Sequence, residues 1–539
     1  MLPRDLVRNC GRNYPDKTAY LCGDRKATWA EMDRRSDRLG AALQRLSPAH
    51  RDGVAVLSQE TIEIYEIFFA CMKIGSPRIG VNTQYAWPEM LHVLKDSGTR
   101  ILIVANRCVH LVAEHRNEID HLGIVMVGFG GNHPFGYDLE TLIAQAPGAP
   151  EWPPLRPDDT LFISYTSGTT GFPKGAMLTQ QGGFNCIVHS LISFGFGPDD
   201  VWYMPAASAW VVVIMNVFGL GNGMTTVLPD GGFEVRAYLH DADRFRVTVA
   251  LLPPTMLQRA IHGIRQSPVY DLSALRLMIY GSSPATPKLI REAKETFRVP
   301  LMQTYAMTET TGGWITYLTE ADHQRALNGE PDLLRSVGRV GVHYECSIRD
   351  PSGQPVALGE AGEIWLRGNT LMKGYRNLPA ATAETMSDGW LRTNDIGRLD
   401  RRGYLYLLDR QKFLIITGAV NVFPATVEAV LAEHPAVEEV AVVGAPHPEW
   451  GEAVVAIVVR KPGFEEATAG DILTICRDRL SRPETPKHVV FVEALPKTST
   501  SKVRKTDLKK WLAGPDAPLP WQAPEEGNGC SQRVRGDVA

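Results

Sequence analysis

Hydrophobic and polar positions alternate between a helical period and short apolar runs over most of the chain. Apolar residues at Met32, Leu39, Leu43 and Leu46 follow a helical stripe that opens at residues 28–32. The runs 54–57 and 101–104 are continuously apolar, which predicts buried strands. Helices alternating with buried strands predict an α/β architecture from about residue 28 to about residue 410.

The pattern changes near residue 410. The segment from Asp400 to Gly403 separates two strand-like runs, and it predicts a hairpin turn with a positive φ at Gly403. Beyond it, a helix follows Pro424, and apolar strands occupy 440–443 and 453–459. We therefore expect a large domain at residues 1–409 and a small α+β domain at residues 413–512. Residues 513–539 are rich in proline, glycine and glutamate, and we expect a disordered tail there.

Composition and charge narrow the class of protein. With 539 residues, 44% of them hydrophobic, the chain is long enough for two or three domains. A net charge of −4 gives no electrostatic case for binding nucleic acid or an anionic membrane. The start lacks the apolar core of a signal peptide, and no apolar run is long enough to span a bilayer. Eight scattered cysteines, without a CxxC pair or zinc-ligand spacing, indicate reduced thiols in a cytoplasmic protein. The oligomeric state is open, and a homodimer is one possibility.

Residues 165–178 (YTSGTTGFPKGAML) carry the strongest chemical pattern. An apolar strand at 161–164 precedes them, and Thr179 can cap a following helix. Glycines allow backbone N–H groups to turn toward an anion, hydroxyls donate to phosphate oxygens, and Lys174 adds a charge. The pattern is not that of a P-loop, because Gly175 follows the lysine. The alternative is an ordinary polar turn, which this density of hydroxyls disfavours.

This stretch resembles the signature loop of the adenylate-forming superfamily, which comprises acyl-CoA synthetases, luciferases and the adenylation domains of peptide synthetases. The resemblance extends over roughly residues 15–512, since further motifs follow in the family's order. It implies a large N-terminal adenylate-forming domain and a small mobile C-terminal domain. It also implies an enzyme closest to the acyl-CoA synthetases, which uses ATP to turn a carboxylic acid into an acyl-adenylate and then a thioester.

The resemblance assigns ATP, Mg²⁺ and coenzyme A to a set of backbone, hydroxyl, aromatic and charged groups. These are Thr166, Ser167, Gly168, Thr169, Thr170, Gly171, Lys174, Gly281, Ser282, Ser283, Thr304, Tyr305, Ala306, Met307, Asp395, Arg410, Thr417, Gly418 and Ala419. Mg²⁺ is assigned to Glu309 and Thr166, since this hard cation prefers oxygen ligands. Tyr305 offers an aromatic face to adenine, and Thr308 is expected near the α-phosphate. Taken alone, Glu309 would be a surface glutamate.

Three assignments concern the end of the large domain and the small domain. Asp395 and Arg410 are expected to bind the ribose, although each alone would be a turn aspartate and a surface ion pair. Lys412, within residues 410–412, matches the hinge about which the small domain rotates between the two half-reactions. Lys502 matches the catalytic lysine, a cation that joins carboxylate and α-phosphate in the transition state. Without the upstream loop, Lys502 would belong to a basic, solvated helix start.

The acid-binding segment is expected at residues 201–216. The family's histidine is missing there; Ser208 lies nearest, and Trp210 resembles a gate tryptophan of some long-chain acyl-CoA synthetases. Trp210 and Val213 are candidate acid contacts, with plain core packing as the alternative. No Asp or Glu occurs between Pro205 and Pro229, which disfavours an amino acid, since its buried ammonium would need a partner. We therefore expect a bulky, largely apolar carboxylic acid.

Three other functions fit the sequence less well than an acyl-CoA synthetase. Retention of Lys502, Glu309 and Asp395 argues against a non-catalytic acyl-nucleotide sensor, and no G-x-S-x-G elbow supports a hydrolase. A stand-alone enzyme that loads a carrier protein stays open, although no carrier-like module follows residue 512.

Several positions depart from the family pattern. They are Ser501, Asn394, Ala306, Ala419 and Phe413, of which the first four replace glycines. Each added Cβ narrows the allowed backbone conformations. These departures raise the alternative of a variant specialised for the thioester-forming half-reaction, with a separate enzyme supplying the acyl-adenylate.

Overall fold

A computed structural model of the protein describes residues 1–47, 52–166, 172–267, 269–283, 285–410, 413–418, 420–477, 479–497, 503–514 and 517–521. The described chain divides into two compact units, Met1–Thr393 with Gly397–Leu407, and Asn394–Ile396 with the residues from Leu408 onward. The secondary structure is mixed α/β, and the fold class predicted from the sequence is confirmed.

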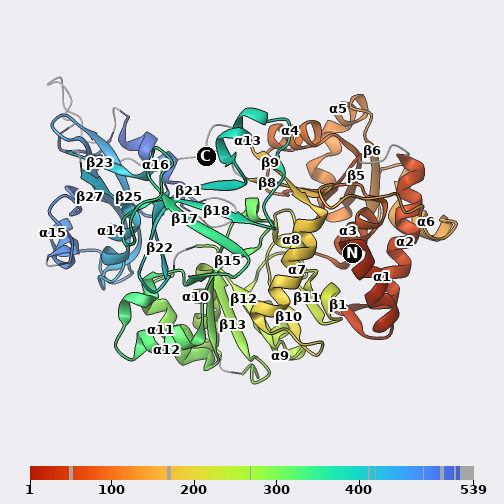
Figure 1. Ribbon diagram of the computed structural model, residues 1–539, viewed down its shortest axis with the longest axis horizontal. Helices are drawn as coiled ribbons and strands as arrows, with labels where there is room; N and C mark the ends of the chain where they lie inside the picture. The colour runs from red at the N-terminus through yellow and green to blue at the C-terminus, as the bar shows by residue number, and fades with distance from the viewer. Residues whose placement is uncertain are drawn as a thin grey trace. The chain divides into compact units, whose positions relative to one another are not determined.

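Two large sheets form most of the first unit (Figure 1). One has the order β16–β15–β14–β13–β12–β10–β11–β1–β2; its strands are β1 (Thr18–Cys22), β2 (Arg25–Thr28), β10 (Val201–Tyr203), β11 (Thr225–Leu228), β12 (Val249–Leu252), β13 (Leu277–Gly281), β14 (Leu301–Ala306), β15 (Trp314–Leu318) and β16 (Arg339–Val340). The other has the order β19–β9–β8–β4–β3–β5–β6–β7; its strands are β3 (Gly53–Leu57), β4 (Arg78–Val81), β5 (Thr99–Ala105), β6 (Val125–Phe129), β7 (Tyr137–Asp138), β8 (Thr160–Thr166), β9 (Lys174–Thr179) and β19 (Gly374–Tyr375).

A smaller sheet runs β17–β18–β21–β20, with β22 on β21. Its strands are β17 (Tyr344–Arg349), β18 (Gly362–Gly368), β20 (Met386–Ser387), β21 (Trp390–Leu399) and β22 (Leu405–Arg410). The predicted turn at Asp400–Gly403 joins β21 to β22, and Gly403 has a φ of +80°. The backbone N–H of Gly403 donates to the Asp400 carbonyl at 3.0 Å, as a tight turn requires.

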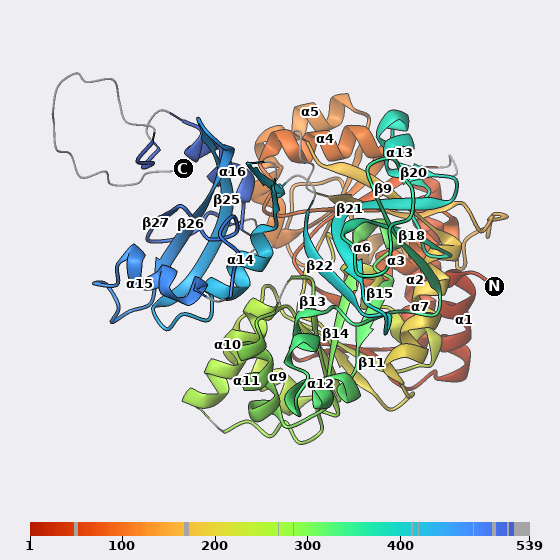
Figure 2. The same cartoon turned by 60° about the vertical axis from the view of Figure 1, so that its left-hand side comes forward.

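Helices cover the sheets of the first unit. They are α1 (Pro3–Asn13), α2 (Trp29–Leu46), α3 (Ile62–Ile74), α4 (Trp87–Ser97), α5 (Arg116–His121), α6 (Leu139–Gln145), α7 (Gln180–Phe194), α8 (Val212–Met215), α9 (Val235–Arg244), α10 (Pro254–Gln266), α11 (Pro287–Phe297), α12 (Glu320–Leu327) and α13 (Pro379–Thr385). Helix α10 contacts α9, α11, β12 and β13, and α10 and α11 lie next to each other in both views (Figures 1 and 2).

The predicted helical stripe belongs to α2. Thr28 and Glu31 form a reciprocal cap at its start, and Met32, Leu39 and Leu43 are buried. Helix α3 is instead buried on every side, and it packs on α2. The predicted strands at 54–57 and 101–104 are β3 and β5, which pair in parallel.

The second unit has its own sheet and core. Its strands β23 (Ile415–Thr417), β24 (Val420–Val422), β25 (Val437–His447), β26 (Gly451–Arg460) and β27 (His488–Phe491) have the order β24–β23–β26–β25, with β27 on β26. The helices α14 (Pro424–Leu431), α15 (Ala469–Leu473) and α16 (Lys505–Leu512) flank it (Figure 2). The helix expected after Pro424 and both expected strands are present. Across all described residues, no helix has the length and apolar character needed to cross a bilayer.

Candidate active site

The glycine- and hydroxyl-rich segment lies between two strands, β8 and β9, that pair with each other. Strands β8 and β9 are antiparallel up to the pair Thr166 and Lys174. Residues 167–171, which include the predicted Ser167, Gly168, Thr169, Thr170 and Gly171, lie outside the described residues. After them, Thr179 caps α7 as predicted, because its side chain accepts from the N–H of Gly182 at 3.0 Å.

Lys174 and Glu309 both contact Tyr375. The Tyr375 hydroxyl donates to Glu309 Oε1 at 2.8 Å, and Lys174 Nζ lies 5.4 Å from the centre of the Tyr375 ring. Glu309 is only 9% exposed, on the single 3₁₀ turn η4 (Thr308–Thr310) that follows β14. Two residues predicted from distant motifs are thereby brought together. Tyr375 was not predicted, since it belongs to none of the motifs and its strand, β19, has two residues.

The predicted nucleotide residues Gly281 and Thr304 pair across β13 and β14. A Cβ on Gly281 would lie 2.5 Å from the Thr304 carbonyl oxygen, so only glycine fits without displacement. Ser282 follows with a φ of +69°, and Ser283 comes next. Tyr305 and Ala306 end β14 and Met307 follows them, at the carboxyl end of strands that pair in parallel, where ligands bind in α/β folds.

The predicted acid-binding segment lies against the turn after Glu309. A Cβ on Gly312 would lie 3.0 Å from Met215 and 3.2 Å from Val211 side-chain carbons. Trp210 is partly exposed and meets the ring of Tyr85 edge-on at 6.1 Å, whereas Val213 is fully buried. Ser208 is 2% exposed. The segment therefore brings apolar side chains up to Gly312, three residues after the predicted catalytic Glu309.

Asp395 and Arg410 form an ion pair, with Arg410 Nε 3.1 Å from Asp395 Oδ1. Asp395 is buried, and the preceding Asn394 has a φ of +58°. Position 394 is therefore one where glycine is favoured, and asparagine is among the residues that tolerate it best. Arg410 is the last residue of β22.

Thr417 and Gly418 lie at the tip of the β23–β24 hairpin. The Gly418 N–H donates to the Trp450 carbonyl at 3.0 Å, and its φ is +53°. Lys412, Ala419, Ser501 and Lys502 lie outside the described residues. A bridge between Lys497 and Val503 pairs the two ends of the segment that holds Lys502.

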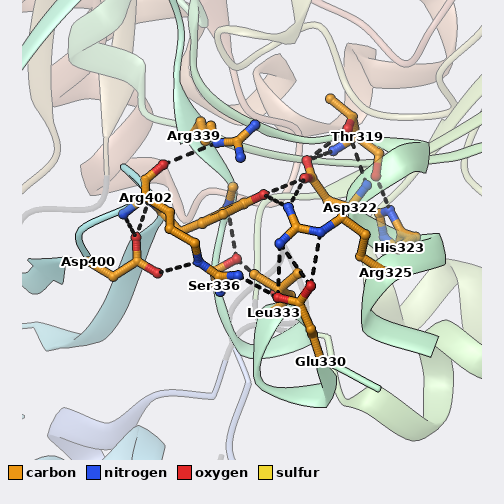
Figure 3. Close-up of polar contacts among 12 residues, drawn as sticks. Thr319, Asp322, His323, Arg325, Glu330, Leu333, Ser336, Arg339, Asp400 and Arg402 are labelled. Carbon is orange, nitrogen blue, oxygen red and sulfur yellow. Dashed lines mark hydrogen bonds and ion pairs between the residues drawn. The ribbon is translucent and has the colours of Figure 1, made fainter. Parts of the chain in front are cut away.

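A polar network that sequence reasoning missed holds the turn before β22 (Figure 3). Tyr404 donates to Asp322 Oδ1 at 2.5 Å and accepts from Arg325 at 3.0 Å. Glu330 then accepts from both Arg325 and Arg402. The network joins α12 and the turn Asp400–Gly403, so it fixes the first-unit end of the strand that leads to Lys412. Its residues carry no motif, and their spacing gave no signal.

Comparison with known proteins identifies the family. A family model described as AMP-binding enzyme matches residues 7–376, and one described as AMP-binding enzyme C-terminal domain matches residues 426–502. The chain belongs to the AMP-binding enzymes. The family predicted from the motifs is confirmed.

Three similar proteins illustrate the range of this AMP-binding family. An indoleacetate–CoA ligase from Aromatoleum aromaticum is 35% identical over 507 residues, which are 93% of this chain and 96% of the relative. The solved o-succinylbenzoate CoA synthetase of Bacillus subtilis, bound to its acyl-adenylate intermediate, has a TM-score of 0.81 at 30% identity and covers 94% of this chain and 97% of its own. An amide bond synthetase from Marinactinospora thermotolerans has a TM-score of 0.84 at 29% identity, covering 95% and 100%.

Proposed function

We propose that this AMP-binding enzyme is an AMP-forming acyl-CoA synthetase for a bulky, largely apolar carboxylic acid. The observation that carries the proposal is the packing of the apolar 210–215 segment against Gly312, next to Glu309 and its partner Tyr375. An acid held by that segment would have its carboxylate near the groups predicted to hold the phosphates. Similarity to a ligase of indoleacetate supports a ring-bearing acid.

ATP, Mg²⁺ and coenzyme A are the cofactors of this reaction, and the donor set fits Mg²⁺. Glu309 supplies a carboxylate and Thr166 a hydroxyl, both hard oxygen donors. Mg²⁺ is commonly held by one or two carboxylates together with substrate phosphates, so one buried glutamate is enough. When bound, the ion would neutralise phosphate charge. Lys174, whose ammonium lies over the Tyr375 ring, would add a second cation.

The direct test is incubation with ATP, Mg²⁺, coenzyme A and a panel of acids. The panel contains acetate, indoleacetate, o-succinylbenzoate, a long-chain fatty acid and an amino acid. We expect AMP release and a CoA thioester, identified by mass spectrometry, with a bulky apolar acid. A preference for acetate or the amino acid would contradict the proposed substrate class, and AMP release without thioester would contradict the acceptor.

Two alternatives concern the second half of the reaction. Similarity to an amide bond synthetase makes an amine acceptor worth a separate arm, in which CoA is replaced by an amine or by a phosphopantetheine carrier protein. The other alternative is weak adenylation, with a separate enzyme supplying the acyl-adenylate. The positive φ of Asn394 favours it, whereas Ala306, among the described residues, is not in the left-handed region. Feeding synthetic acyl-adenylate and CoA should give much faster thioester formation than acid, ATP and CoA; similar rates would reject this alternative.

A further inference from the structure

Two buried, oppositely charged side chains hold the backbone of Ser208. Its N–H donates to Glu60 Oε2 at 3.0 Å, and its carbonyl oxygen accepts from Arg78 Nη1 at 2.6 Å. Glu60, just before α3, is 5% exposed, and Arg78, the first residue of β4, is 2% exposed. Neither side chain belongs to a motif of the predicted site. Both act on the residue that stands nearest the family's missing histidine.

Glu60 is itself fixed by a chain of hydrogen bonds that reaches both ends of the acid-binding segment. Tyr65 donates to Glu60 Oε1, and Asn216 Nδ2 donates to the Tyr65 hydroxyl at 2.9 Å. Asn216 Oδ1 in turn accepts from Trp202 Nε1 at 3.1 Å. The segment is therefore held at its start, at Ser208 and at its end. Such a network of buried hydrogen bonds restricts a backbone more than apolar contacts do.

The segment also lies directly on β4. A Cβ on Gly80 would lie 2.3 Å from the Ala209 carbonyl oxygen, so glycine alone allows this approach. Arg78 and Gly80 are two positions apart and therefore lie on the same face of β4. Trp210 follows at once and meets Tyr85, which lies just beyond β4. The position of Trp210 is thus fixed by β4 and by Glu60, which lies just before α3.

Charges at this depth need a reason. Burial raises the pKa of Glu60 and lowers the pKa of Arg78, because each loses its hydration. Apolar side chains of similar volume are often as stabilising as buried charged groups, and fixing one arrangement is the best-attested use of such charges. Here the arrangement that the two charges fix is that of the segment carrying Trp210.

We propose that Glu60 and Arg78 are positioning residues that fix Trp210 and thereby determine which acyl groups the site accepts. The inference rests on the proposed function, because it needs Trp210 to contact the acid. It predicts that the two residues act on acyl selectivity and leave the nucleotide part of the site unchanged. It also predicts that their effects are not additive, since both act through the Ser208 backbone.

The test measures binding of two stable acyl-adenylate analogues, acetyl- and indoleacetyl-sulfamoyl adenosine, by calorimetry. Wild-type protein should prefer the indoleacetyl analogue. In Arg78→Met and Glu60→Leu, the ratio of the two affinities should fall at least about tenfold, the scale for one hydrogen bond to a charged group. Arg78→Lys keeps a donor for the Ser208 carbonyl, and Glu60→Gln keeps an acceptor for its N–H, so both should restore most of the ratio.

Lys73→Met is the matched control. Lys73 is also a fully buried cation, paired with Asp33 at 2.6 Å and Asp37 at 2.9 Å, but its partners lie on α2. This variant should lose stability and keep the wild-type affinity ratio. If Arg78→Met and Glu60→Leu also keep that ratio, or weaken both analogues equally, the inference is wrong.

The outcome is separable from that of the proposed function, since binding needs no turnover. A wild-type protein that binds the analogues but makes no thioester would contradict the function while the ratio still tests the inference. Should the Met and Leu variants fail to fold, Tyr65→Phe decides the question, because it keeps the buried ring and removes the hydroxyl that links Glu60 to Asn216. Its ratio of the two analogue affinities should fall, and an unchanged ratio, or an equal loss for both analogues, would overturn the inference.

Discussion

At the scale of single residues, Tyr375 explains how the predicted metal ligand is held. Its hydroxyl donates to Glu309, and its ring faces Lys174. Tyr375, which belongs to no motif, therefore connects two residues that come from different motifs. Glu309→Gln removes the charge and keeps an acceptor for Tyr375. We expect the Mg²⁺ concentration for half-maximal AMP release to rise at least about tenfold, with a smaller rise for Tyr375→Phe, which keeps the carboxylate. Magnesium titrations of the two variants that coincide with wild type would remove Glu309 from the metal site.

Lys502 is the predicted catalytic lysine of acyl-adenylate formation. Its Lys502→Ala variant should slow acyl-adenylate formation by roughly 10²–10³-fold, the scale for one preorganised transition-state charge or donor. Thioester formation from supplied acyl-adenylate should be slowed less, because that step does not bring two anions together at the α-phosphate. Single-turnover measurements of each half-reaction check this. Equal losses in both would mean that Lys502 has a structural role or serves both steps.

At the scale of secondary-structure elements, the contact between β13 and β14 depends on Gly281. Gly281→Ala places a Cβ 2.5 Å from a backbone oxygen of the neighbouring strand. We expect a loss of about 1–3 kcal/mol in the free energy of unfolding, the usual cost of overpacking, measured by urea denaturation. Gly232→Ala serves as control, since a Cβ there meets nothing within 4 Å and its φ is not positive. Equal stability of the two variants would contradict the close approach.

The packing of α7 against the segment before β17 gives a pH prediction. His189 on α7 stacks on His343 with ring centres 3.9 Å apart. Burial, together with nearby His343, lowers the pKa of His189 to about 4, whereas an unfolded histidine titrates near about 6.5. Between these values the unfolded chain binds a proton that the folded chain does not, so stability falls as the pH is lowered through this window.

The variant His189→Phe keeps a stacking ring and removes the titration. Its free energy of unfolding should therefore decrease less than that of wild type between pH 7 and about pH 4.5. Urea unfolding at both pH values measures the difference. An unchanged pH dependence would mean that His189 does not contribute to it.

At the scale of the whole molecule, the chain passes from the first unit to the second within β22, between Leu407 and Leu408, shortly before the predicted hinge at Lys412. The Tyr404 network holds the first-unit end of this connection, so backbone rotation is expected beyond it (Figure 3). Lys412→Pro would restrict φ to near −65°. We expect the ratio of the two half-reaction rates to change on the order of tenfold, because only one arrangement of the units stays accessible. Rates of both half-reactions that fall together, or not at all, would argue against a hinge at this residue.

The sequence by itself determined the family, the α/β class and the few elements with a strong local pattern. Apolar periods located α2, β3 and β5, and the turn at Gly403 followed from turn chemistry, because these signals are local. The motifs at Lys174, Glu309, Asp395 and Lys502 indicated the chemistry, since phosphate and metal binding demand particular residue types at short spacing.

Only the tertiary structure decided which distant residues meet. Tyr375 reaches Glu309 because β19 pairs with β9, and Glu60 and Arg78 reach Ser208 because β4 lies beneath that segment. None of these contacts leaves a periodic trace, since each joins one side chain to a partner far along the chain. Likewise, the burial of Val213 and partial exposure of Trp210 depend on what packs over the segment, which the apolar sequence could not distinguish.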